Sequence, residues 1–426
     1  MKVTIINIGD ELLIGQVVNT NAAHIARQLT TAGMDVANIE IIGDDACTIR
    51  DTISHALAAS DAVICTGGLG PTRDDITKNV LVRLFGGELV ENKEQLHIIE
   101  SIFARRGYPM TEINRKQSWT PSSCTTIPNP VGTAPAMWFE VPNGKYRITD
   151  DNTTQVVVAT PGVPFETLHL METEIVPRLR RHFGTQCILT KNILTQGIGE
   201  SFLSDLIEQW ELTLPANVKL AYLPQAGMTK LRLTAHGNDP AALQQQLLTA
   251  TRHLYPIAGQ YIAAEDCETL SEAVAQIFKQ RRLTLATAES CTEGYIASQL
   301  TQLAGASEYF RGAVVSYCNE VKQAALGVKA DTLEQHTAVS SETASEMAAG
   351  VRERLHSDYA IATTGIAGPN GGCKEHPVGT VWIAIATPQG VQAHLGHFGG
   401  NTRQHVIERA TNEAFHLLIN QVQEKK

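Results

Sequence analysis

The stretch DAVICTGGLGPTRDD (residues 61–75) joins an apolar segment directly to a glycine-rich one. The apolar part has the length and composition of a buried β-strand. The three glycines that follow it, within five residues, let backbone N–H groups approach an anion closely. Since α/β sheets bind ligands beyond the carboxyl ends of their strands, the stretch predicts an α/β domain with a ligand loop at this edge.

The segments around this stretch have the same character. Amphipathic helices are predicted over residues 20–32 and 47–60. Further strands are predicted at VTIINIG (3–9), VANIEIIG (36–43) and VVVATPG (156–162). Strands that alternate with helices of this length predict a mostly parallel sheet covered on both faces, which makes residues 1–170 a three-layer α/β domain.

Two more domains are predicted along the chain. Residues 171–262 have the order β-α-β-β-α-β, which is typical of a small α+β module. Residues 263–426 return to α/β alternation, with apolar strands at 283–289 and 359–365 and a final helix over 402–421.

Composition and charge narrow the class of protein. The 426 residues carry a formal net charge of −10, which argues against non-specific binding to nucleic acid or to an anionic membrane. No apolar run approaches the ~20 residues that span a bilayer, and the amino-terminal segment resembles a strand and not a signal peptide. The eight cysteines form no CxxC pair. We therefore expect a cytoplasmic protein with free thiols and no structural zinc.

The glycine-rich loop offers candidates for phosphate and metal binding. The candidates for phosphate are Thr66, Gly67, Gly68 and Gly70, with Arg73 as a bidentate donor. Asp74 and Asp75 would repel a phosphate unless a divalent cation bridges them, so they are candidate metal ligands. The alternative is a plain turn in which Asp74 caps a helix.

A candidate nucleophile lies in the third domain. Ser290 belongs to AESCTEG (288–294), which follows an apolar strand and is expected to open a helix near residue 292. A serine nucleophile needs a base, and Tyr317 and Lys322 of SYCNEVK (316–322) are the candidates. Asn319 is expected to cap the helix that carries Lys322, where the helix dipole and burial would lower the pKa of the amine.

Structural alternatives exist for each of these residues. Ser290 and Glu293 have capping-box spacing, and Cys291 is a rival nucleophile without an evident histidine partner. The segment TTGIAGPNGG (363–372) is a ligand loop or a flexible turn, and Arg403 holds a ligand phosphate or is a solvated surface arginine.

Motifs along the whole chain, in their order, resemble those of the CinA family (competence/damage-inducible protein A). They are GDELLIGQVVNTNAAHIARQL (9–29), TGGLGPTRDD (66–75), NPVGTAP (129–135), TPGVPFE (160–166), AESCTEG (288–294), GAVVSYCNEVK (312–322), TTGIAGPNGG (363–372), PVGTVWIAI (377–385) and GGNTRQHV (399–406). The resemblance implies a molybdopterin-binding-like first domain, a KH-like middle domain and a third domain similar to nicotinamide-nucleotide amidase.

The resemblance also implies activities and partners. The third domain would deamidate nicotinamide mononucleotide (NMN) without a cofactor. Ser290 would be the nucleophile, activated by Lys322 and Tyr317, and Thr364, Gly365 and Arg403 would bind the substrate. The first domain would cleave ADP-ribose with a divalent metal such as Mg²⁺, and the chain would form a homodimer.

Departures from the family pattern leave other functions open. The family usually has two glycines after the Ser-Cys-Thr run, where this chain has Glu293 and then Gly294, and Ile407 stands where the family has a second arginine near the last helix. The middle domain has GIGES (197–201) and lacks the GxxG loop with which KH modules clamp a nucleic-acid backbone, so we expect it to be a linker or dimerisation domain. The alternative function is a non-catalytic pterin- or nucleotide-binding protein in competence or the response to DNA damage.

Overall fold

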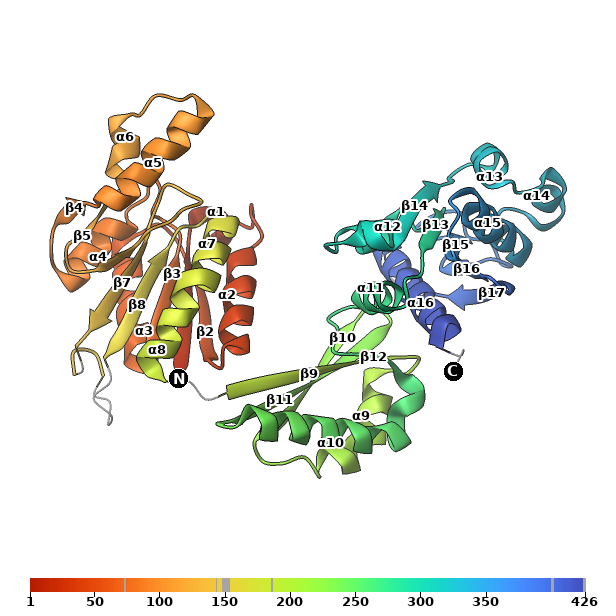
Figure 1. Cartoon of the computed structure of the whole chain (residues 1–426), viewed down its shortest axis with the longest axis horizontal. Helices are drawn as coiled ribbons and strands as arrows, with labels where there is room; N and C mark the ends of the chain where they lie inside the picture. The colour runs from red at the N-terminus through yellow and green to blue at the C-terminus, as the bar shows by residue number, and fades with distance from the viewer. Residues whose placement is uncertain (73, 143, 148–153, 185–186, 400–401, 424–426) are drawn as a thin grey trace. The chain divides into compact units, whose positions relative to one another are not determined.

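The computed structural model describes the chain except for residues 73, 143, 148–153, 185–186, 400–401 and 424–426. It is a mixed α/β protein that divides into two compact units. The first consists mainly of residues 1–189, and the second of residues 190–235 and 244–426 (Figure 1). Among the described residues, no helix combines the length and the apolar character that a membrane span needs.

The first domain is built on a six-stranded sheet with the order β2-β1-β3-β8-β7-β6. Neighbours β2, β1, β3 and β8 are parallel, while β7 and β6 add antiparallel strands at one edge. The strands of this sheet are β1 (Lys2–Ile8), β2 (Asp35–Ile42), β3 (Ala62–Thr66), β6 (Thr125–Ile127), β7 (Ala136–Val141) and β8 (Gln155–Thr160), and a separate pair is formed by β4 (Leu89–Glu91) and β5 (Trp119–Pro121). The mostly parallel sheet predicted from the sequence is confirmed.

Helices cover both faces of this sheet and make the predicted three layers. The helices are α1 (Asp10–Leu13), α2 (Thr20–Thr31), α3 (Ala46–Ala59), α4 (Thr77–Phe85), α5 (Lys93–Arg106), α6 (Glu112–Lys116), α7 (Pro164–Leu170), the π-helical turn η1 (Met171–Ile175) and α8 (Val176–Phe183). Ile25 of α2 packs in one apolar cluster with Ile64, whereas Ile53 of α3 packs in another with Val63. Because Val63 and Ile64 are consecutive in β3, these clusters lie on opposite faces of the sheet.

The helical segment that ends the first domain continues past the predicted boundary. Met171, Ile175 and Leu179 are fully buried and pack in the same cluster as Ile25 and Ile64. The boundary predicted after residue 170 therefore falls inside a helical segment that runs to Phe183.

The middle domain has the predicted β-α-β-β-α-β order and a sheet order of β10-β11-β9-β12. Its elements are β9 (Cys187–Gln196), α9 (Glu200–Glu211), β10 (Val218–Gln225), β11 (Met228–Gly237), α10 (Pro240–Ala258), the 3₁₀ turn η2 (Gly259–Tyr261) and β12 (Ile262–Glu265). β10 and β11 pair antiparallel from Gln225 and Met228 outward, so they form a β-hairpin with a tight turn, in which Gly227 has a φ of 76°.

The third domain contains a five-stranded sheet with the order β14-β13-β15-β16-β17. Strands β14, β13 and β15 are parallel, and β16 and β17 continue the sheet antiparallel. The strands are β13 (Leu285–Glu289), β14 (Phe310–Val315), β15 (Tyr359–Gly365), β16 (Thr380–Thr387) and β17 (Gly390–His397). The helices are α11 (Leu270–Arg281), α12 (Tyr295–Thr301), η3 (Ala306–Glu308), α13 (Asn319–Leu326), α14 (Ala330–His336), α15 (Ser341–Arg354) and α16 (Arg403–Gln423).

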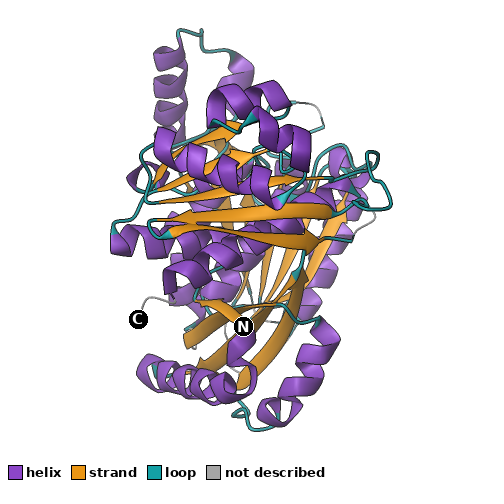
Figure 2. Cartoon of the chain, turned by 90° about the vertical axis from the view of Figure 1, so that its right-hand side faces the viewer, coloured by secondary structure: helices purple, strands orange, loops and turns teal. Residues whose placement is uncertain are grey.

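Helices pack against the sheet of the third domain on two faces (Figure 2). Phe278 of α11 and Phe415 of α16 share a core with Leu285 and Ile361, whereas Met347 of α15 packs with Ala286. Because β13, β14 and β15 are parallel neighbours, their carboxyl ends lie at one edge of this sheet. The segments that contain Ser290, Tyr317 and Thr364 therefore meet at this edge.

Candidate active site

Ser290 lies in a tight turn between β13 and α12. Its backbone N–H donates to the carbonyl of Thr363 at 3.0 Å, which anchors the turn to the end of β15. Helix α12 begins only at Tyr295, and Gly294 is its N-cap residue, without a side-chain cap. The predicted helix is present but begins three residues later than residue 292, and the alternative that Ser290 is its cap is wrong.

Lys322 lies beside Ser290 in the folded chain. Its Nζ is 3.1 Å from Ser290 Oγ and donates to the carbonyl of Ser316 at 2.7 Å. Only 2% of Lys322 is exposed, and this burial lowers the pKa of its amine because water no longer stabilises the charge. Lys322 is in the first turn of α13, as predicted, but the N-cap is Cys318 and not Asn319.

A fully buried carboxylate supports the Ser290 turn. Glu289 accepts hydrogen bonds from the N–H groups of Ile296 at 3.0 Å and Ala297 at 2.9 Å, and from the hydroxyls of Thr287 and Thr292. Burial nevertheless raises the pKa of Glu289, because desolvation outweighs these bonds. Glu289 therefore stabilises the turn between β13 and α12. It was not among the predicted site residues, and its signal in the sequence is a carboxylate at the end of an apolar strand.

Tyr317, Thr364 and Gly365 lie near the same sheet edge, but within the described residues no side chain of Tyr317 or Thr364 forms a hydrogen bond to Ser290 or Lys322. The side chain of Tyr317 is 68% exposed and makes no hydrogen bond to either residue in the described part of the chain. The hydroxyl of Thr364 donates to the carbonyl of Ala338 at 2.5 Å. A Cβ at Gly365 would lie 2.4 Å from the carbonyl oxygen of Thr380, so pairing with β16 is a sufficient reason for this glycine.

Arg403 begins α16 and reaches the Ser290 turn. Its guanidinium donates to Glu293 Oε2 from Nε at 3.4 Å and from Nη2 at 3.2 Å, and from Nη1 to the carbonyl of Gly368 at 3.1 Å. Arg403 therefore joins the turn after β13 to the loop after β15. It is paired with a carboxylate and is not the freely solvated arginine that was the alternative.

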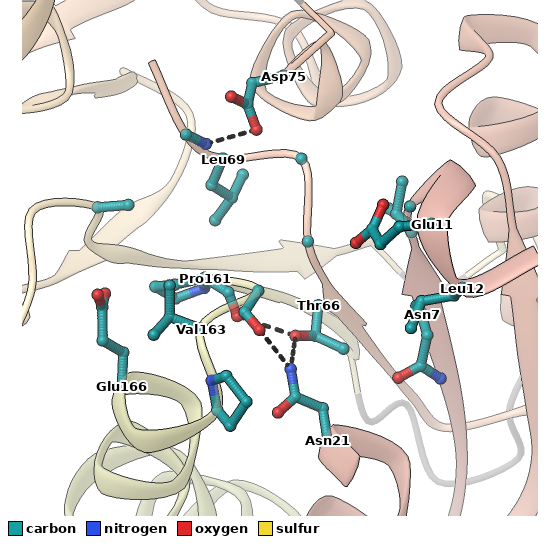
Figure 3. A pocket seen from close by; sticks show the side chains of 18 of the residues that line it. Asn7, Glu11, Leu12, Asn21, Thr66, Leu69, Asp75, Pro161, Val163 and Glu166 are labelled. Atoms are coloured by element: carbon teal, nitrogen blue, oxygen red, sulfur yellow. Dashed lines mark hydrogen bonds between the residues drawn. The ribbon is translucent and has the colours of Figure 1, made fainter. Parts of the chain in front are cut away.

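The first domain contains a cavity of about 410 Å³ at the carboxyl edge of its sheet (Figure 3). The loops after β1, β3 and β8 line it, as expected for a parallel sheet. Asn21 crosses between two of these loops, since its amide donates to Thr66 Oγ1 at 3.2 Å and to the carbonyl of Gly162 at 2.7 Å. The predicted residues Thr66, Gly67, Gly68, Gly70, Asp74 and Asp75 all line the cavity, whereas Arg73 lies outside the described residues.

Close contacts explain the glycines of this loop. A Cβ at Gly67 would lie 2.1 Å from the carbonyl oxygen of Ile8, and one at Gly68 would lie 2.1 Å from Thr77 Oγ1. Both residues also have positive φ, 110° and 66°. A side chain at either position would displace the loop that forms the cavity.

The two predicted metal ligands differ in their surroundings. Asp75 accepts hydrogen bonds from the N–H of Gly70 and the N–H of Thr72, both at 2.8 Å, so its carboxylate shapes the loop (Figure 3). Asp74 is exposed, and a hydrogen bond from Thr72 lowers its pKa. Helix α4 begins at Thr77 with Ile76 as its N-cap residue, so the alternative that Asp74 caps a helix is wrong.

The cavity is also lined by three carboxylates that were not among the predicted ligands: Glu11, Asp44 and Glu166. Burial raises the pKa of Asp44, and the charges of Asp10, Glu11 and Asp74 raise it further. No group of three or more His, Cys, Asp or Glu side chains is arranged to hold a metal within the described ranges. These oxygen donors suit a Mg²⁺ ion that is held by one or two carboxylates and completed by a ligand's phosphates and water.

The fold and these two sites define a three-domain α/β protein with a cavity at the carboxyl edge of the first domain's sheet and a serine–lysine pair in its third domain. Three family descriptions match it: "Probable molybdopterin binding domain" over residues 4–181, "Damage-inducible protein CinA KH domain" over 190–263 and "CinA C-terminal domain" over 267–422. The chain belongs to the CinA family.

Relatives that match almost the whole chain agree with this assignment. A "CinA-like protein" of Flavobacterium psychrophilum is 42% identical over 427 residues, covering 99% of each chain. A "Putative competence-damage inducible protein" of Halothermothrix orenii is 36% identical over 419 residues, covering 98% of each. A competence/damage inducible protein of Agrobacterium tumefaciens of known structure is 39% identical, with a TM-score of 0.36, and covers 36% of this chain and 94% of that one.

Proposed function

We propose that the third domain hydrolyses the carboxamide of NMN to nicotinic acid mononucleotide and ammonia. The observation that carries this proposal is the 3.1 Å separation of Lys322 Nζ from Ser290 Oγ, with the lysine buried. A buried amine of lowered pKa loses its proton more readily and can then act as a base toward the neighbouring hydroxyl.

The reaction would proceed in two halves. Neutral Lys322 accepts the proton of Ser290 as the serine oxygen bonds to the carboxamide carbon. The carbon–nitrogen bond then breaks, Lys322 returns the proton to the departing ammonia, and an ester remains on Ser290. Water attacks this ester, Lys322 takes and returns a proton again, and nicotinic acid mononucleotide leaves.

A backbone donor near Ser290 supports stabilisation of the oxyanion. The N–H group of Gly294, a partly exposed residue, has no hydrogen-bond acceptor within the described part of the chain, and Gly294 belongs to the turn that contains Ser290. Such a preorganised donor stabilises the negative charge that develops on the substrate oxygen. Thr364, Gly365 and Tyr317 are proposed to contact the substrate around this centre.

An assay of NMN turnover by the purified chain tests this function directly. We expect ammonia and nicotinic acid mononucleotide to form in equal amounts from NMN, without an added metal or cofactor. Tight binding of NMN without any turnover would contradict the proposal and favour a nucleotide-binding role.

Replacing Cys291 with alanine will leave this activity within about twofold of the wild type. Cys291 is 5% exposed, and burial raises the pKa of its thiol to about 12, so it carries almost no thiolate near neutrality. Steady-state kinetics with NMN will measure the effect. A loss comparable to that of the Ser290 variant discussed below would identify the thiol as the nucleophile.

A second activity is proposed for the first domain, the metal-dependent cleavage of ADP-ribose to AMP and ribose 5-phosphate. Its support is the cavity lined by Glu11, Asp44, Asp74 and Asp75, in which phosphates would need a bridging cation. Bound Mg²⁺ would supply charge neutralisation and polarise the phosphates. The chain's own residues would orient the ligand: the loop of Gly67 and Gly68 offers close backbone approach to the pyrophosphate.

AMP formation from ADP-ribose will require Mg²⁺ and will fall at least about tenfold in Asp74→Asn, because the variant loses a carboxylate that would hold the cation. Glu100→Gln, which removes an exposed carboxylate of α5, will keep its activity. Cleavage that is unchanged by chelation of the metal would contradict this assignment.

The expected homodimer is likewise a proposal, which light scattering on the purified chain will test.

A further inference from the structure

An ion pair at the Ser290 turn bears on which substrates the third domain accepts. Glu293 is three residues after Ser290, and its N–H donates to the carbonyl of Ser290 at 3.2 Å. Its carboxylate accepts two hydrogen bonds from the guanidinium of Arg403 through a single oxygen, Oε2. The side chains of Glu293 and Arg403 are 49% and 32% exposed, so both are open to solvent beside the Ser290 turn.

The backbone at Glu293 shows that this carboxylate occupies an unusual position. Its φ is 51°, in the left-handed region where glycine is favoured, and the next residue, Gly294, has a φ of 90°. A residue with a side chain pays of order 1 kcal/mol for this conformation. The conformation directs the Glu293 side chain toward Arg403, a residue 110 positions away in the sequence.

Arg403 is the group in this region suited to a phosphate. A guanidinium binds phosphate oxygens bidentately, and its Nη1 is already oriented by the carbonyl of Gly368 at 3.1 Å. Its partner Glu293 belongs to the turn that contains Ser290, and the Glu293 N–H donates to the Ser290 carbonyl at 3.2 Å, so the guanidinium lies beside this turn. The Glu293 carboxylate neutralises the positive charge of Arg403, so a phosphate dianion near the guanidinium encounters an ion pair with no net charge.

We propose that Glu293 is a specificity-determining residue: its carboxylate neutralises Arg403 and so weakens the preference of the site for substrates that carry a phosphate. This inference rests on the proposed amidase function. The preference can be measured with two substrates that share the same carboxamide, NMN with its 5′-phosphate and nicotinamide riboside without it. Exposed ion pairs are weak. The Glu293–Arg403 pair is therefore expected to reduce the affinity for NMN without preventing its binding.

Glu293→Gln tests this inference, since glutamine keeps the length of the side chain and removes its charge. We expect the KM for NMN to fall about three- to tenfold with little change in kcat, and the KM for nicotinamide riboside to stay the same. The difference between wild type and variant should shrink as salt is raised, because salt screens exposed charges. Glu334→Gln, which neutralises an exposed carboxylate of α14, is the matched control and should change neither KM.

The outcomes separate the two proposals. An equal change in KM for both substrates would show that Glu293 acts on the shape of the turn and would overturn the inference, as would an unchanged KM for NMN. If wild type and variant turned over neither substrate, the amidase function would fail. Calorimetric binding of NMN and of the riboside to the two proteins would then decide whether Glu293 still weakens phosphate binding.

Discussion

Replacing Ser290 with alanine will lower kcat/KM for NMN by at least about 10³-fold, because the chain loses the oxygen that forms the bond to the carboxamide carbon. The substitution is expected to leave the fold intact. The backbone N–H of residue 290 can still donate to Thr363, and Glu289 still holds α12 through Ile296 and Ala297. The loss should therefore appear in kcat, with the affinity for NMN little changed.

The control for this variant is Ser298→Ala. Ser298 lies on α12, is exposed, and accepts a hydrogen bond from the amide of Gln302 at 3.3 Å. We expect it to retain full activity. Intact-mass measurement on wild type quenched during turnover should also detect the acyl group on the chain, and Ser290→Ala should show none. Near-normal turnover by Ser290→Ala would reject the serine mechanism, whatever the behaviour of the other variants.

The meeting of Ser290 and Lys322 could be predicted because it follows from sheet topology. The two residues are 32 positions apart, but each follows one of two neighbouring parallel strands, β13 and β14. Apolar strands that alternate with helices predict such a sheet, and parallel strands bring their carboxyl ends to one edge. The ligand loop after β3 was predictable for the same reason.

Other features of the sites depend on contacts that no local pattern contains. The spacing of Ser290 and Glu293 matches a capping box, yet a tight turn delays α12 until Tyr295, and Glu289 takes the N–H groups of its first turn. Arg403 and Glu293 come together only when α16 packs on the domain. In the first domain, Glu11 and Asp44 follow β1 and β2, and their convergence on one cavity depends on how the loops close.

The activity of the third domain will depend on pH through Lys322. Only the neutral amine can accept the serine proton, so kcat/KM should rise with pH up to the pKa of Lys322 in the folded chain and level off above it. Since burial lowers this pKa from the ordinary value of 10.5, the rise should be centred below 10.5. A pH–rate profile of the wild type with NMN will measure it.

Two substitutions of Lys322 distinguish its proposed role as a base from an effect of its positive charge. Lys322→Met keeps much of the apolar stem and removes the amine, whereas Lys322→Arg keeps a positive charge that cannot be given up. Both should lose about 10²- to 10⁴-fold in kcat/KM, and neither should show the alkaline rise. Substantial activity in Lys322→Arg would show that the amine acts through its charge, which would contradict its role as a base.

Stability gives a readout of Lys322 that does not depend on turnover. Because its pKa is lowered by folding, the unfolded chain binds more protons than the folded chain between the folded-state pKa and 10.5. This group therefore makes the free energy of unfolding increase with pH across that interval, and Lys322→Met should abolish its contribution. Denaturant unfolding of wild type and Lys322→Met at a series of pH values will compare the two slopes. Equal slopes would mean that the lysine is solvated in the folded chain, and a solvated lysine would stay protonated near neutrality and could not serve as the base.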